Sequence, residues 1–174
     1  REGDVIVLVG TRHAVGEQKF PLGGTRWATK RGRRGGHVPG FDGGALVRAI
    51  EFVAAEISSI CAGNASDVTA VHDVGGGGLS VALAEMVAVT GLGADVIELE
   101  HHGELFAEFP GRFVMATKNL DAFRARSDRA GVPVISLGTV GGDALLIGAM
   151  IDVSVDEVSS RRRDALEVSL ASLG

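Results

Sequence analysis

The sequence predicts an α/β (α+β) domain in which helices flank a mixed β-sheet. Three observations lead to this class. Short apolar runs rich in β-branched residues alternate with segments whose apolar residues recur at helical spacing. Gly-Gly-Asp at 141–143 separates the runs VPVISLGTV and ALLIGAMI, a pattern typical of an antiparallel hairpin. With 174 residues, 45% of them hydrophobic, the chain is long enough for a domain with its own core.

The first third of the chain predicts a strand, a long loop and a helix. Residues 4–10, DVIVLVG, form a continuous apolar run that ends in glycine and indicates a buried strand. Residues 11–40 are dominated by Gly, Arg and Lys and indicate a long basic loop. A helix is expected over residues 42–62, with Asp42 as its N-cap. Its apolar residues at helical spacing are Leu46, Val47, Ile50, Val53, Ile57 and Ile60.

The middle of the chain predicts three strands and one helix. The strands are expected at 68–73, 94–99 and 112–117, and the helix runs from about residue 79 to residue 90. We expect this helix and the helix that starts near Asp42 to pack on one face of the sheet. The residues buried together in that arrangement are Leu83, Met86, Val87, Val7, Val71 and Val114.

The last third of the chain contains two helix signals. Asn119 is placed to cap a helix, and Gly131 followed by Pro133 is placed to end it. Ser154 and Glu157 match the capping box S-x-x-E, which predicts a last helix from about residue 155 to residue 170.

The composition narrows the classes of function. The chain has 17 basic and 22 acidic residues and a formal charge of -5, which argues against nucleic acid as the main partner. No charge-free apolar run reaches about 18 residues, so no membrane span and no membrane partner are expected. The single cysteine, Cys61, cannot form an internal disulfide, and its place on the apolar side of a predicted helix indicates a buried thiol. This cysteine usage fits a reducing compartment.

The chain shows no internal repeat and no interior linker, so residues 1–174 are expected to form a single domain. The first residues, REGDVIVLVG, include neither an initiator Met nor a signal-like region, and they start at the threshold of a strand. We therefore expect the chain to be a piece of a longer protein.

The main candidate site is the run of four glycines in HDVGGGGLSVALAEM, between a predicted strand and a predicted helix. The N-terminus of a helix exposes backbone N–H groups and a partial positive charge, which favours phosphate or carboxylate. The candidate anion-binding residues are Gly75, Gly76, Gly77, Gly78 and Leu79. No Lys-Ser/Thr pair follows the glycines, and Ser80 stands where a dinucleotide fingerprint has its third glycine. A tight turn that tolerates no Cβ is the alternative explanation.

Other polar residues give weaker signals. Asp73 ends a predicted strand, where a carboxylate holds a metal or, more often, caps a helix. His101 and His102 with Glu104 suggest a metal, but neighbouring residues of an extended segment point to opposite sides, so no metal site is predicted. The basic stretch of Lys30, Arg31, Arg33 and Arg34 is suited to neutralising phosphates, or is a solvated loop. No catalytic set of side chains follows from the spacing.

Several ordered stretches resemble one enzyme family. VHDVGGGGLSVALAEM resembles the H-D-V-S-D-G-G-L-x-x-A-L-x-E-M signature of the C-terminal domain of the aminoimidazole ribonucleotide synthetase superfamily. ELFAEFPGRFVMAT, AGVPVISLGTVGGDALLI, GDVIVLVGTR and LGGTRWA are similar to segments of the phosphoribosylformylglycinamidine synthases within it. The motifs cover about residues 3 to 158, and the chain resembles the second C-terminal AIRS-type domain of the synthetase subunit.

The resemblance implies a function for the full-length protein. It implies a cytoplasmic ligase of purine biosynthesis that uses ATP, Mg²⁺ and glutamine to convert formylglycinamide ribonucleotide to the amidine. The implied partners are an upstream ATP-binding half of the same protein and a glutaminase domain or subunit. The family's catalytic histidine and ATP-binding segments lie mostly upstream, so this chain is expected to be mainly structural and inactive in isolation.

The sequence departs from the family pattern at the candidate site. Gly75 and Gly76 stand where the family has Ser and Asp, and Glu108 is kept while Phe109 and Pro110 replace the Ser and Gln of E-S-Q. Asp73 and Glu108 are therefore interpreted as motif remnants. Two alternatives stay open. One is a non-catalytic module that binds a phosphorylated metabolite or nucleotide, and the other is the C-terminal domain of another superfamily enzyme such as selenophosphate synthetase.

Overall fold

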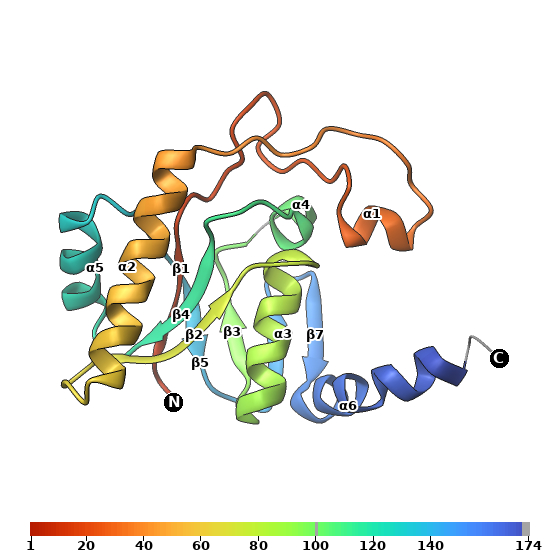
Figure 1. Cartoon of the computed structure of the whole chain (residues 1–174). Helices are drawn as coiled ribbons and strands as arrows, with labels where there is room; N and C mark the ends of the chain where they lie inside the picture. The colour runs from red at the N-terminus through yellow and green to blue at the C-terminus, as the bar shows by residue number, and fades with distance from the viewer. Residues whose placement is uncertain (100, 172–174) are drawn as a thin grey trace.

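The computed structural model describes residues 1–99 and 101–171, which fold around one seven-stranded sheet (Figure 1). The strand order is β2-β4-β1-β5-β3-β6-β7, and β3 and β6 are the parallel pair among otherwise antiparallel neighbours. The strands are β1 (Val5–Val9), β2 (Val68–Asp73), β3 (Ala94–Val96), β4 (Phe113–Thr117), β5 (Val134–Val140), β6 (Ala144–Ile147) and β7 (Ile151–Ser154). The predicted mixed sheet is confirmed.

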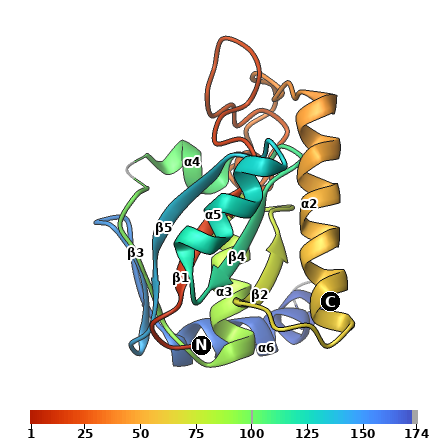
Figure 2. The ribbon, with the colours of Figure 1, turned by 90° about the vertical axis from the view of Figure 1, so that its left-hand side faces the viewer.

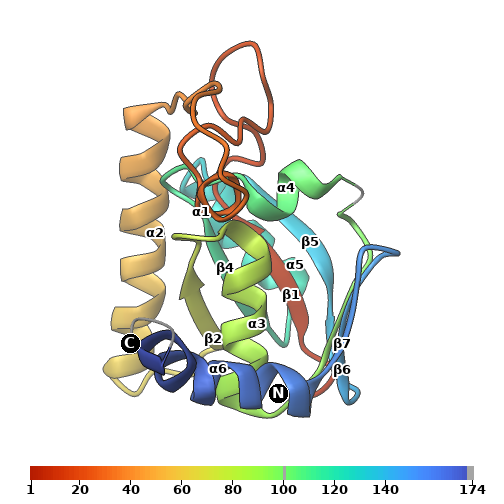
Figure 3. The same cartoon turned by 90° about the vertical axis from the view of Figure 1, so that its right-hand side faces the viewer.

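Helices cover both faces of the sheet. They are α1 (Arg26–Lys30), α2 (Gly43–Cys61), α3 (Gly78–Thr90), α4 (His102–Phe106), α5 (Leu120–Arg129) and α6 (Val155–Ala171). Figure 2 shows α5 in front of the sheet with α2 beside it, and Figure 3 shows α3 and α6 in front of the opposite face. Within the described residues, no helix is both long enough and apolar enough to cross a bilayer.

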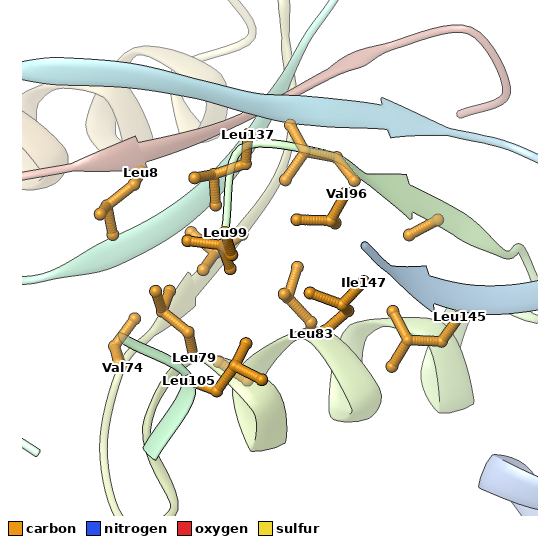
Figure 4. Packing of buried hydrophobic residues seen from close by; sticks show 14 of the residues in the cluster. Leu8, Val74, Leu79, Leu83, Val96, Leu99, Leu105, Leu137, Leu145 and Ile147 are labelled. Atoms are coloured by element: carbon orange, nitrogen blue, oxygen red, sulfur yellow. The ribbon is translucent and has the colours of Figure 1, made fainter. Parts of the chain in front are cut away.

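The two faces of the sheet bury separate cores, because successive side chains of a strand point to opposite sides. Leu8 and its β4 neighbour Val114 lie in the core under α3, together with Leu83 (Figure 4). Val7 lies in the core under α2 and α5, where the Phe52 and Phe123 rings meet edge to face at 5.5 Å.

The prediction that the helices starting near Asp42 and Leu79 share one face is therefore wrong. Leu83, Val87 and Val114 are buried together as expected, and Met86 packs against the same core. Val7 and Val71 belong to the opposite core, because they stand at the other parity of their strands. Alternation separates the two faces within one strand, and the register between strands decides which residues of neighbouring strands share a core.

The apolar face predicted for α2 is largely in contact with solvent. Ala49, Phe52 and Val53 make the buried face, whereas the exposed fractions of Val47 and Ile50 are 52% and 48%. Cys61 is also exposed, so the prediction of a buried thiol is wrong. The helix is rotated relative to the expectation because Ala49 and Phe52 also carry apolar surface, and that face meets α5.

The chain turn at residues 141–143 does not join a hairpin. β3 lies between β5 and β6, and the backbone N–H of Gly93 donates to the Gly142 carbonyl at 3.0 Å. A Cβ on Gly93 would lie 2.4 Å from the Ala144 carbonyl oxygen, so the absence of a side chain is what lets the two segments approach. The hairpin forms instead between β6 and β7, around residues 148–150.

The predicted helix ends are found where the sequence placed their caps. Asp42 Oδ1 accepts hydrogen bonds from the Gly44 and Ala45 N–H groups, and those bonds, Ala45 first, lower the pKa of Asp42. Asn119 Oδ1 accepts from Ala122 N at 3.1 Å, and Ser154 Oγ accepts from Glu157 N at 3.2 Å. Residues 11–40, expected as a loop, also contain the short helix α1.

Candidate functional site

The glycine run forms the turn between β2 and α3. Gly77 is the N-cap of α3 at φ 98°, Gly78 follows at φ 70°, and α3 has no side-chain cap. The Gly78 N–H donates to the Gly75 carbonyl at 3.0 Å, which closes the turn. Both conformations lie in the left-handed region, where glycine alone is unstrained. Gly75 and Gly76 have no such positive φ.

Glu108 places its carboxylate at this turn. Its Oε1 accepts from the Gly77 N–H at 2.8 Å and from the Arg26 N–H at 2.7 Å. The N-terminal ends of α3 and α1 are thus joined by one carboxylate oxygen. The positive end of the α3 dipole favours a negative group there. A ligand anion at Gly77 would have to displace this carboxylate.

Arg112 fixes the segment that carries Glu108. Its guanidinium is buried, lies 3.8 Å from the Phe109 ring centroid, and donates from Nη2 to the Ala107 carbonyl. Burial lowers the pKa of Arg112 to about 10, and the nearby charge of Glu104 opposes that decrease. The guanidinium is therefore protonated at neutral pH, and it contacts both neighbours of Glu108, the backbone carbonyl of Ala107 and the ring of Phe109.

An open cleft lies beside the turn. It has a volume of about 500 Å³, and Arg26, His72, Asp73 and Glu85 line it together with Gly75, Gly76, Gly78, Val81 and Ala82. His72 Nε2 lies 3.3 Å from the Glu85 carboxylate, whereas Nδ1 lies 2.6 Å from the backbone carbonyl oxygen of Asp73 and 3.8 Å from the Asp73 carboxylate. The Asp73 side chain is 75% exposed, so it is a solvated carboxylate at the mouth of the cleft.

The expectation that His101 and His102 point to opposite sides is wrong, although Glu104 has a partner of its own. The two histidines stack at 4.5 Å, because residues 101 and 102 begin helix α4 instead of continuing a strand. His101 Nδ1 accepts from the Gly103 N–H, and Glu104 pairs with Arg12 at 2.6 Å. No group of three metal-binding side chains occurs among residues 1–99 and 101–171.

Two features of the turn were not visible in the sequence. Arg26 lies beside Gly76, with its Cδ 3.1 Å from the position of a Cβ built there. Glu108 was interpreted as a motif remnant, but its contacts join segments that are 82 and 31 residues away along the chain. The only sequence feature that pointed to a role for Glu108 was the family motif E-x-x-G-R, which contains Glu108 and Arg112.

The glycine turn and most of the sheet lie in a segment that matches one known protein family. The family described as "AIR synthase related protein, C-terminal domain" matches residues 1–148. The chain belongs to this family. Within it, the chain is similar to the phosphoribosylformylglycinamidine synthase subunit PurL of Parvibaculum lavamentivorans, with 34% identity over 98% of the chain. The PurL of Methylocella silvestris is 35% identical over 92% of the chain.

The likeness to solved structures supports the fold. "T. maritima PurL complexed with FGAR" superposes with a TM-score of 0.65 at 22% identity, covering 91% of this chain and 28% of that chain. The chain spans 23% of the length of the Parvibaculum PurL and 21% of the Methylocella PurL. The family resemblance inferred from the ordered motifs is confirmed.

We expect Glu108→Ala to lower the free energy of unfolding by about 1–2 kcal/mol, because the N–H groups of Gly77 and Arg26 lose their shared acceptor. Glu108→Gln keeps an amide oxygen at this position and should cost less. Urea unfolding followed by circular dichroism measures both changes. Glu51→Ala, at an exposed position of α2, is the control. Equal losses for Glu108→Ala and Glu51→Ala would mean that these hydrogen bonds do not stabilise the turn.

Proposed function

We propose that this chain is the C-terminal AIRS-type domain of a phosphoribosylformylglycinamidine synthase. The full-length protein would be a cytoplasmic ligase that converts formylglycinamide ribonucleotide to the amidine with ATP, Mg²⁺ and glutamine-derived ammonia. The observation that carries this proposal is the 34% identity to a PurL over 98% of the chain. The solved relatives include T. maritima PurL complexed with ATP and PurLQS from the same organism.

Within that enzyme we propose a structural role for this domain. Glu108 supplies the negative charge at the N-terminus of α3, where the sequence predicted an anion site at residues 75–79. The side chains of the neighbouring cleft do not fit Mg²⁺, because His72 lies between the carboxylates of Asp73 and Glu85 and the described residues hold no three-ligand group. The ATP and Mg²⁺ of the reaction would therefore be held by other parts of the protein.

The proposed partners follow from the same relationship. They are an ATP-binding half of the same protein and a glutaminase domain or subunit. Selenophosphate synthetase receives less support, because the relatives from Parvibaculum lavamentivorans and Methylocella silvestris are PurL subunits.

A chimera tests the proposed function. The segment of Parvibaculum PurL that this chain matches is replaced by the chain, and amidine formation from formylglycinamide ribonucleotide is measured with ATP and ammonia. We expect activity in the chimera, and none in the chain alone or in PurL without that segment. Melting and ATP binding show whether the chimera is folded. A folded chimera that binds ATP but forms no amidine would contradict the proposal, and so would amidine formation by the chain alone.

A further inference from the structure

Positive charge gathers around the one tryptophan of the chain. No acidic residue occurs between Glu17 and Asp42, although the whole chain has a formal charge of -5. The cations near Trp27 in this interval are Arg26, Lys30, Arg31, Arg33 and Arg34. All five side chains are exposed. The charge of this segment therefore opposes that of the rest of the molecule.

Two of these cations share the indole of Trp27. The Cζ atom of Arg31 lies 4.4 Å from the ring centroid, and that of Arg33 lies 5.5 Å from it. The two guanidinium groups are thus at most about 10 Å apart, which is close to the screening length of about 8 Å at physiological ionic strength. Among the described residues, neither guanidinium has an ion pair with a carboxylate. An anion bound next to both would relieve their repulsion.

A cavity opens beside Trp27 and Arg33, and Arg31, which does not line this cavity, lies over the Trp27 ring. The cavity has a volume of about 250 Å³, and Trp27, Arg33, His37, His102 and Gln18 contribute its polar and aromatic side chains. Its remaining lining comes from Leu22, Gly23, Ala28, Gly35 and Gly36, so no carboxylate lines it. Cationic and neutral groups alone surround the cavity, which suits an anionic ligand.

Two backbone segments that line the cavity, at Gly23 and at His37, contact each other closely. The Gly23 N–H donates to the His37 carbonyl at 3.0 Å, and a Cβ on Gly23 would lie 2.5 Å from that oxygen. Trp27 also packs on α4. The centroid of its ring lies 5.9 Å from that of His102 and 6.2 Å from that of Phe106. Figure 3 shows α1 above the start of α3, at the same end of the sheet as α4. The two arginines therefore lie against an aromatic ring that itself packs on α4.

We propose that Arg31, Arg33 and the cavity beside Trp27 form a binding site for a tetrahedral phosphate group, free or as a small sugar ester. The planar guanidinium presents paired N–H donors that match two oxygens of a phosphate. The cavity is smaller than the roughly 300–1,000 Å³ typical of sites for drug-sized ligands, so a small ester fits and a large cofactor does not. The glycine turn takes no part in this site.

Trp27 reports on this site directly, because it is the only tryptophan. The whole chain is titrated with inorganic phosphate and with ribose 5-phosphate at constant ionic strength, and Trp27 emission is recorded. We expect a saturable change with half-saturation below about 1 mM, because a phosphate that binds the two guanidinium groups alters their position on the indole. A tighter response to ribose 5-phosphate identifies an ester site, and an equal response identifies a phosphate site.

Variants distinguish specific binding from general attraction to a basic loop. Arg31→Gln and Arg33→Gln should each weaken binding by about tenfold or more. Arg124→Gln, at an exposed position of α5, removes one positive charge elsewhere and should leave binding unchanged. Melting curves confirm that the variants are folded. Four results would overturn the proposal: no saturable response to either probe in the wild-type protein, the same response to chloride, saturable binding that both arginine variants retain, or equal weakening by Arg124→Gln.

Discussion

Replacing Leu83 by Ala is expected to lower the free energy of unfolding by about 2–5 kcal/mol. Leu83 is 2% exposed and lies in the core between α3 and the sheet, where Figure 4 shows it pointing toward Val96 and Ile147. Truncation removes buried apolar surface and leaves a cavity that the sheet cannot close, since the strands on that face are held by their hydrogen bonds. Urea unfolding followed by circular dichroism measures the loss.

Val89 provides the control on the same helix. Its side chain is 69% exposed, so Val89→Ala should change stability by less than about 0.5 kcal/mol. Ala has the highest helix propensity, so neither substitution lowers it, and a loss of stability at Leu83 alone reports burial. A loss below about 0.5 kcal/mol for Leu83→Ala would mean that α3 does not pack on this face.

The elements of the fold could be predicted because their signals are local. Asp42 and Asn119 place a short acceptor one residue before a helix, and the structure uses both as caps. The run VTAVHD predicted a strand at 68–73, and β2 spans those residues. Each signal depends on residues that are neighbours in the chain, so no knowledge of the tertiary structure is required.

The packing of those elements could not be predicted in the same way. The insertion of β3 between β5 and β6 depends on pairing between residues about 40 apart, such as Asp95 and Thr139. The face of α2 that is buried depends on α5, whose Arg126 bonds Glu56 with two hydrogen bonds at 2.8 and 3.0 Å. The pattern at 141–143 correctly predicted a turn. After this turn the chain passes the end of β3, and β6 pairs with β3 instead of with β5.

The candidate site shows the same division. The run of glycines predicted a turn that other residues would not tolerate, and Gly77 and Gly78 adopt positive φ. The contact of Glu108 with Gly77 could not be inferred, because it requires the placement of residues 105–108 against the start of α3. The cationic stretch was visible in the sequence, whereas its stacking on Trp27 depends on the path of α1.

The four glycines are expected to respond differently to substitution. Gly78→Ala should destabilise the protein by at least about 2 kcal/mol, because φ at this position is positive and the new Cβ would lie 2.4 Å from the Leu105 carbonyl oxygen. That oxygen is backbone, so it cannot turn aside as a side chain would. Gly77→Ala should also destabilise, by about 1–3 kcal/mol, since its Cβ would lie 2.3 Å from Val81 Cγ2 at φ 98°.

Gly75→Ser and Gly76→Asp should change stability by less than about 0.5 kcal/mol. Neither position has a positive φ, and the nearest atoms to a new Cβ are Asp73 Oδ2 at 3.2 Å and Arg26 Cδ at 3.1 Å. Both are atoms of exposed side chains that can rotate into solvent, and Gly76→Asp adds a carboxylate beside the Arg26 guanidinium. Thermal melts of the four variants test this difference. Equal losses at all four positions, or stable variants at 77 and 78, would show that the turn does not require positive φ at Gly77 and Gly78.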